Sequence, residues 1–301
     1  MKLMMVRTAG GERPAVQDGN EAVLLPDTIA DLTALAELGE QGLAIARQTQ
    51  TGRGTQRLSI DGLELGPPLR RLRRDVLCCG WNYWDHFEES KGKREGQDVD
   101  QPKAPTFFTK GPDTIIGPTD DVAYDIRISA KWDYEAEVAL VIGKAGRSIR
   151  QENACDHILG LTLANDVSQR DLQRRHGGQW LKGKSIDQTM PIGPMIVTLD
   201  ELDIPEMRLE LLLNGVIMQS ALLKQMAFPI EQLVSELSFG MTLRPGDLVL
   251  TGTPSGIGNA REPQVFLKEG DTMVVQATGL GSMKNKLTNV DLAHDSDIVL
   301  N

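Results

Sequence analysis

Cysteine is scarce in this chain of 301 residues, which has only Cys78, Cys79 and Cys155. Adjacent cysteines on a strand would point to opposite faces, and a single further thiol remains to pair with either of them. A disulfide framework and a thiolate metal site are therefore not expected. We interpret the three side chains as small apolar groups in a protein of a reducing compartment.

Basic charge and long apolar runs are lacking as well. The net charge of −10 leaves no excess of lysine and arginine to neutralise phosphates, which argues against a general nucleic-acid-binding protein. No apolar run has the length that crossing a bilayer requires, and residues 1–14 lack the apolar core of a signal peptide. We expect a cytoplasmic protein with neither nucleic acid nor a membrane as a partner.

Two regions differ in their pattern of strand and helix candidates, and the boundary between them is predicted near residue 72. Residues 1–72 are expected to form a small N-terminal α/β domain, in which a turn with glycine and proline separates strand candidates at 2–8 and 21–25. A helix should follow, capped by Asp27 or Thr28. Its apolar residues are spaced three apart along one face: Ile29, Leu32, Leu35 and Leu38.

Residues 73–301 are expected to form a mostly β catalytic domain. Short strand candidates follow one another at 76–79, 106–109, 135–142, 159–164, 195–198, 209–213, 248–251 and 272–277. Helical patterns are fewer, and the clearest begins at Pro229. This order of elements is typical of an α+β fold rather than of a doubly wound sheet. The long charged stretch Asn82–Lys103 is interpreted as a lid or as a disordered segment.

The strand-like segment 132–142 places carboxylates together. Its even positions are apolar, whereas its odd positions begin with Asp133, Glu135 and Glu137 and then turn apolar. Glu135 and Glu137 would repel each other unless a cation joins them, and paired carboxylates suit Mg²⁺ or Mn²⁺. An acidic patch on an edge strand is the alternative interpretation of this segment.

Two further acidic positions stand in settings that suggest chemistry. Asp166 follows the apolar strand candidate 159–164, where functional side chains commonly lie, although a turn or a helix cap would use the same Asn-Asp pair. His86 and Glu89 are three residues apart, so that on a helical turn the carboxylate can orient the imidazole as a general base requires. A surface ion pair is the alternative for these two residues.

Two glycine-containing loops offer groups that bind anions. Lys184, between Gly183 and Ser185, can present its ammonium group to a developing oxyanion, or it can be a solvated loop lysine. The sequence Thr-Gly-Thr-Pro at 251–254 ends a strand candidate and offers hydroxyl groups and backbone amides to a carboxylate. A plain β-turn is the alternative for this second loop.

The order of these motifs is more informative than any one of them. Over about residues 75–287 the chain contains, in order, Asn-Tyr-x-x-His-x-x-Glu, Phe-x-x-Lys, Asp-Tyr-Glu-x-Glu, Val-Ile-Gly-Lys, Asn-Asp-Val-Ser, Gly-Lys-Ser, Pro-x-Gly-Pro, Leu-x-Pro-Gly-Asp and Thr-Gly-Thr-Pro. As an ordered set they resemble the fumarylacetoacetate hydrolase family, and within it the bacterial acylpyruvate and diketo-acid hydrolases.

The resemblance implies a fold and a set of roles. The fold would be the family's mixed β-sandwich roll, usually assembled as a homodimer. The metal, Mg²⁺ or Mn²⁺ with Ca²⁺ as a further candidate, would be held by Glu135, Glu137 and Asp166. The catalytic residues would be His86, Glu89 and Lys184, and the substrate would be bound by Gln173, Gly252 and Thr253.

The implied activity is metal-dependent hydrolysis of a carbon–carbon bond in a 2,4-dioxo acid of the acylpyruvate, fumarylpyruvate or diketo-deoxy sugar acid type. Water activated by His86 would attack the distal carbonyl group, and the leaving enolate would be stabilised by the metal. The same site would serve decarboxylation of oxaloacetate or isomerisation of a hydroxymuconate-type acid. An alternative of another class is a non-catalytic protein that binds a metal and a 2-oxo acid.

Overall fold

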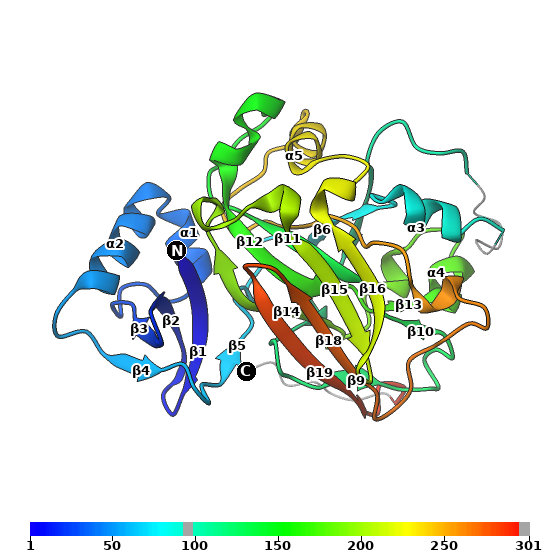
Figure 1. Ribbon diagram of the computed structural model, residues 1–301, viewed down its shortest axis with the longest axis horizontal. Helices are drawn as coiled ribbons and strands as arrows, with labels where there is room; N and C mark the ends of the chain where they lie inside the picture. Colours follow the sequence, from blue (N-terminus) through cyan, green and yellow to red (C-terminus); the bar gives the residue numbers. More distant parts are fainter. Residues whose placement is uncertain (93–98, 295–301) are drawn as a thin grey trace.

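The structure, a computed structural model, describes residues 1–92 and 99–294. Within these residues, twelve strands form one large mixed sheet (Figure 1). Ten of them lie side by side in the order β4 (Arg57–Ser59), β3 (Glu21–Leu24), β2 (Gly11–Asp18), β1 (Lys2–Thr8), β14 (Met190–Val197), β12 (Ile158–Asn165), β11 (Ala136–Ile142), β17 (Leu248–Leu250), β6 (Val76–Gly80) and β7 (Thr106–Lys110). The other two are β5 (Leu65–Gly66), which pairs with β1, and β8 (Ile115–Ile116), which pairs with β14.

A second sheet packs against one face of the large one. Its strands lie in the order β16 (Val216–Leu222), β15 (Arg208–Leu213), β18 (Thr272–Ala277), β19 (Gly281–Asn289) and β9 (Val122–Tyr124). Val138 and Leu140, at even positions of β11, share a core with Leu209 of β15, whereas Ala139 and Val141 belong to a separate core. The alternation predicted for this strand is confirmed, and so is the α+β, mostly β fold.

The N-terminal strands extend the large sheet at one end. Strand β1 pairs with β14 through Lys2 with Val197 and Leu3 with Ile196. Helices α1 (Leu32–Glu37) and α2 (Glu40–Thr51) lie with β1–β4 at the left of Figure 1. The division of the chain into domains at residue 72 stays a prediction.

Two local predictions for this region were wrong. Helix α1 begins after Asp31, whose side chain accepts the N–H of Ala34 at 2.7 Å, rather than after Asp27 or Thr28. Residues 11–18 form β2 rather than a turn, because they pair with β1 on one side and with β3 on the other. The pairing of β2 with the strands directly before and after it in the chain outweighed the local turn signal of glycine and proline.

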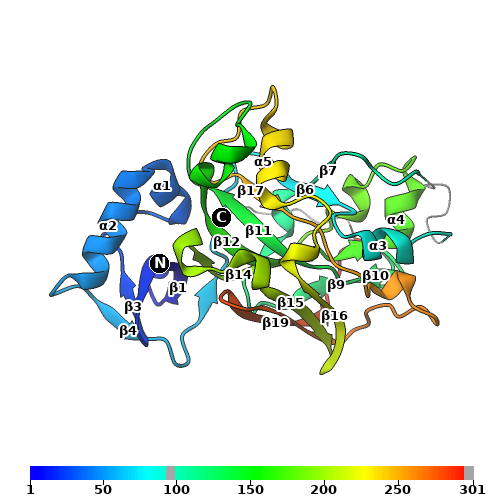
Figure 2. The same ribbon diagram turned by 45° about the horizontal axis from the view of Figure 1, so that its top comes forward.

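Three further α-helices lie among the remaining described residues. Helix α5 (Ile230–Ser238) begins directly after Pro229, as predicted. Helices α3 (Trp84–Glu89) and α4 (Arg170–Arg175) lie side by side at the end of the molecule away from α1 and α2 (Figures 1 and 2). Helix α3 belongs to the lid predicted for Asn82–Lys103, but residues 93–98 lie outside the described residues, so the lid stays a prediction. No helix in the described part of the chain is long and apolar enough to cross a membrane.

Asn82 joins the end of β6 to two other elements. Its side chain is fully buried and donates to the carbonyl oxygens of Thr251 at 2.7 Å and Phe228 at 3.1 Å. Its Oδ1 atom accepts the N–H of Phe228 at 2.8 Å. This side chain therefore holds the segment before α3 against the ends of β17 and the chain that precedes α5.

Replacement of Asn82 by Ala is expected to lower the free energy of unfolding by about 3 kcal/mol, because the buried backbone groups that it serves lose their partners. Urea unfolding followed by circular dichroism measures the change. Asn20→Ala, which removes an exposed bond to Asp61, is the matched control and should change the value by less than about 0.5 kcal/mol. Equal unfolding midpoints for the two variants would contradict the structural role of Asn82.

Candidate active site

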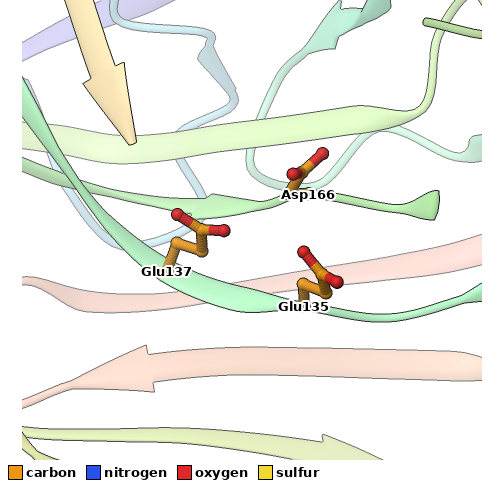
Figure 3. A group of neighbouring side chains, drawn as sticks. All are labelled: Glu135, Glu137 and Asp166. Carbon is orange, nitrogen blue, oxygen red and sulfur yellow. The ribbon is translucent and has the colours of Figure 1, made fainter. Parts of the chain in front are cut away.

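Three carboxylates meet where β11 begins and β12 ends (Figure 3). Glu137 is in β11, Glu135 precedes this strand, and Asp166 follows β12. The N–H of Asp166 donates to the carbonyl oxygen of Glu135 at 2.9 Å, which continues the pairing of β11 with β12 beyond both strands. The three residues are buried, and one carboxylate oxygen of each lies within 4.8 Å of those of the others. The cluster that the sequence predicted is therefore present.

The segment that carries the two glutamates is not the single strand that the sequence suggested. A short strand, β10 (Trp132–Asp133), pairs with β13 (Ser168–Gln169), and β11 begins only at Ala136. Asp133 accepts the N–H groups of Gly258 at 2.7 Å and Asn259 at 2.9 Å, and the Nε–H of Arg170 at 2.9 Å. It therefore anchors a loop beside the cluster and is not a member of it.

Three buried cations face the carboxylates. The Nζ atom of Lys184 lies 2.6 Å from an oxygen of Glu135 and 2.6 Å from one of Asp166. The Nζ atom of Lys110 donates to the other oxygen of Asp166 at 2.8 Å, and Nη2 of Arg170 lies 2.7 Å from Glu135. Charged side chains this deeply buried persist when they are paired, so these five residues form one network.

Sequence reasoning assigned no role to Lys110 or Arg170. Lys110 is the last residue of the Phe-x-x-Lys motif, and Arg170 lies between Asp166 and Gln173 in a segment already singled out as polar. A lysine at the end of an apolar strand candidate was the available signal for the first. Nothing in the local pattern distinguished the second from the neighbouring Arg174 and Arg175.

Among the described residues, none of these three cations forms an ion pair with Glu137. Burial, together with Asp166 and Glu135, raises the pKa of Glu137 well above its usual value. Burial also acts to raise the pKa of Glu135, but the nearby Lys184 and Arg170 outweigh it and lower that pKa to about 2. Three hard oxygen donors in one buried site fit a divalent cation such as Mg²⁺ or Mn²⁺, which would remove the repulsion at Glu137.

The imidazole of His86 faces the same cavity from α3. Its Nδ1 atom lies 2.8 Å from Oε1 of Glu89, and Oε2 of Glu89 accepts the N–H of Gly256 at 2.8 Å. His86 lines the cavity together with Glu135 and Glu137. Glu89 thus orients the imidazole through Nδ1, whereas the catalytic roles of both residues stay predictions.

The residues predicted to bind substrate are placed in two ways. Gln173 and Thr253 line the cavity. The N–H of Gly252 instead donates to Oε2 of Glu137 at 2.6 Å. Gly252 has a φ of 96°, and a Cβ atom there would lie 2.8 Å from Cβ of Asn82, so this position requires glycine. The substrate-binding roles of all three residues stay predictions.

Comparisons with known proteins agree with this arrangement. Residues 75–288 match the family described as Fumarylacetoacetate (FAA) hydrolase C-terminal. The oxaloacetate tautomerase YisK of Bacillus subtilis is 39% identical over 235 residues, which cover 78% of this chain and 76% of that protein. The human mitochondrial oxaloacetate tautomerase FAHD2A is 39% identical over 265 residues, which cover 87% of this chain and 80% of that protein.

A solved structure matches nearly the whole fold. It is the fumarylacetoacetate hydrolase of the psychrophile Exiguobacterium antarcticum, with a TM-score of 0.81 and 32% sequence identity. The match covers 96% of this chain and 100% of that one. The motif order, the buried carboxylate cluster and these matches agree, and the chain belongs to the fumarylacetoacetate hydrolase family.

Proposed function

We propose that this protein is a divalent-metal-dependent tautomerase that interconverts the enol and keto forms of a 2-oxo acid of the oxaloacetate type. The observation that carries this proposal is the buried cluster of Glu135, Glu137 and Asp166 with the ammonium group of Lys184 against it. The relatives named oxaloacetate tautomerases support isomerisation, which the sequence left as an alternative, over the carbon–carbon hydrolysis that it predicted first.

Tautomerisation needs stabilisation of an enolate and a proton at carbon. The O–H bond of the enol breaks and its electron pair completes the C2=O double bond. The electron pair of the C2=C3 double bond then forms a C3–H bond with an incoming proton, so that the composition of the acid is unchanged. A divalent cation held by Glu135, Glu137 and Asp166 would supply Lewis-acid polarisation of the carboxylate and the 2-oxo group. Lys184 lies against the same carboxylates, where its positive charge stabilises the negative charge of the enolate oxygen.

His86 is the proton carrier in this scheme. Its ring lines the cavity, and the bond from Nδ1 to Glu89 holds the other ring nitrogen ready for transfer to and from C3. Glu89 is itself fixed by the N–H of Gly256, so the imidazole is positioned before the substrate arrives. Arg170, which contacts Glu135 and Asp133, keeps the wall of the cavity in place.

Metal removal is expected to abolish enzymatic conversion of enol oxaloacetate to the keto form. Chelator-treated protein should regain its activity with Mg²⁺ or Mn²⁺, because the polarisation that the cation supplies amounts to several kcal/mol of barrier lowering. Loss of enol absorbance in the near ultraviolet, corrected for the spontaneous reaction, measures the rate. Full activity in protein shown by elemental analysis to be metal-free would contradict the proposal.

Hydrolysis of an acylpyruvate is the second candidate, and the bond between His86 and Glu89 is what favours it. An imidazole oriented by a carboxylate can take a proton from water, which hydrolysis of a carbon–carbon bond requires and tautomerisation does not. Pyruvate release from acetylpyruvate reports hydrolysis, and carbon dioxide release from oxaloacetate reports decarboxylation. Binding of these acids without any of the three reactions would indicate a non-catalytic protein. The homodimer and the cytoplasmic location stay predictions.

A further inference from the structure

Three aromatic rings form one wall of the cavity that contains the carboxylates. They belong to Trp81, Phe108 and Trp180, all of which line it. The ring centroids of Phe108 and Trp180 are 4.9 Å apart with an interplanar angle of 69°, and those of Trp180 and Trp81 are 4.9 Å apart at 83°. These edge-to-face contacts are the arrangement that aromatic rings favour, so the three side chains form one packed group, which we call the aromatic wall.

The aromatic wall begins directly beside the charged network. The Nζ atom of Lys184 lies 5.3 Å from the centroid of the Phe108 ring, within the range of a cation–π contact. The same Nζ atom lies 2.6 Å from oxygens of Glu135 and Asp166. A 2-oxo acid bound at the carboxylate cluster would therefore direct a substituent on C3 toward the wall within a few bond lengths.

The backbone is adapted to hold these rings. A Cβ atom at Gly80 would lie 2.6 Å from a carbon of the Trp180 ring, so the lack of a side chain there lets the ring lie against the backbone of β6. Trp81 has a φ of 55°, which a bulky residue rarely adopts. Such a conformation persists where the surrounding structure holds it, and it is typical of functional sites. The same three rings also line a neighbouring hollow of about 310 Å³.

We propose that the aromatic wall is a subsite for the distal group of the substrate, and that it accepts a planar, apolar group there. The rings carry no ionisable group, so burial of an aryl substituent against them is favourable. The substrate class of the site then includes arylpyruvates in addition to oxaloacetate. This inference rests on the proposed function for its chemistry, but its binding test does not depend on turnover.

Equilibrium binding of phenylpyruvate and pyruvate to the metal-loaded protein tests the subsite. The two acids share the metal-binding end and differ by the phenyl group, and calorimetry measures both dissociation constants. We expect phenylpyruvate to bind about tenfold more tightly than pyruvate, and this preference to fall to near unity in Phe108→Leu and in Trp180→Leu. Equal affinities in the unmodified protein, or a preference that survives both substitutions, would overturn the proposal.

Trp84→Leu is the matched control, because this substitution removes a tryptophan that does not line the cavity. The ring of Trp84 packs against that of Phe228 with centroids 5.5 Å apart. Its preference for phenylpyruvate should equal that of the unmodified protein. A second variant, Gly80→Ala, keeps all three rings but displaces Trp180, and it should lower the preference without removing an aromatic group. If Gly80→Ala and Trp84→Leu behave alike, the position of Trp180 does not matter and the proposal fails.

Turnover separates this proposal from the proposed function. Enol-to-keto conversion of phenylpyruvate and of oxaloacetate is measured in each variant. The quantity compared is the kcat/KM for phenylpyruvate divided by the kcat/KM for oxaloacetate. The ratio should fall about tenfold in Phe108→Leu and Trp180→Leu. A phenylpyruvate preference in binding without tautomerisation of either acid would refute the proposed function and leave the subsite in place, whereas tautomerisation of oxaloacetate with no binding preference would do the reverse.

Discussion

Glu137→Gln is expected to lower metal-dependent turnover by more than about a hundredfold while leaving the fold intact. The substitution keeps the size of the side chain and an oxygen that can accept the N–H of Gly252, but it removes a charged donor from the cluster with Glu135 and Asp166. Even groups that only orient metal ligands contribute 10–100-fold to affinity or activity, so loss of a ligand should cost more. Titration of Mn²⁺ by calorimetry and the enol assay measure the two effects.

The stability of the metal-free protein should not fall in this variant. Burial and the neighbouring Asp166 and Glu135 raise the pKa of Glu137, which means that the site already opposes a charge there. Glu206→Gln is the matched control, because Glu206 forms an exposed ion pair with Lys224. Unchanged Mn²⁺ affinity in Glu137→Gln would show that this carboxylate is not a ligand, and a large loss of unfolding temperature would show that its role is structural.

His86→Ala should slow the reaction by roughly 10²–10⁴-fold, the range typical for loss of a positioned acid or base. The substitution removes the ring nitrogen proposed to carry the proton, whereas the carboxylates and Lys184, proposed to stabilise the enolate, remain. The loss should appear mainly in kcat, because His86 is not a member of the carboxylate cluster proposed to bind the metal. Steady-state kinetics with oxaloacetate, together with a Mn²⁺ titration, separate the two contributions.

Glu89→Gln is expected to cost less than His86→Ala, because the imidazole remains and only its orientation suffers. A neutral amide has one oxygen, so it cannot accept from both the imidazole and the N–H of Gly256 as the carboxylate does. His157→Ala is the control, since that ring contacts the carbonyl oxygen of Lys144. A His86→Ala protein with the rate of the unmodified enzyme would remove His86 from the mechanism and leave α3 as a cover.

His86→Ala and Glu137→Gln together separate the candidate reactions. Hydrolysis of an acylpyruvate needs a base to activate water, so His86→Ala should lower its rate by at least roughly 10²–10⁴-fold. Decarboxylation of oxaloacetate depends chiefly on the electron sink, so it should suffer more from Glu137→Gln than from the loss of His86. A protein that tautomerises oxaloacetate but releases neither pyruvate from acylpyruvates nor carbon dioxide would agree with the proposed function.

Much of the site was predictable because its signals are local or lie in a fixed order. The alternation that puts Glu135 and Glu137 on one face depends only on the two-residue period of a strand. The spacing of His86 and Glu89 depends only on the pitch of a helical turn, and the structure has the two side chains 2.8 Å apart. Asp166 was placed with them by the resemblance that the order of the motifs carries, and the match over residues 75–288 confirms membership of that family.

Other features depended on which strands became neighbours. The break between β10 and β11 follows from the pairing of β10 with β13. Because of it, the Asp133 side chain accepts the N–H groups of Gly258 and Asn259 and does not join the other carboxylates. Lys110 reaches Asp166, 56 residues away in the sequence, because β7 ends beside the cluster. No local pattern contains that information, since it arises from long-range pairing.

The sequence by itself determined the residue types, their faces and the order of the motifs, and these identified the family and the carboxylate cluster. Only the tertiary structure decided how the cations are distributed, with Lys184 and Arg170 against Glu135, whose pKa they lower, whereas burial raises the pKa of Glu137. It alone also brought the aromatic wall to Lys184. The physical reason is that charge and packing act through space over a few ångströms, whereas periodicity acts along the chain.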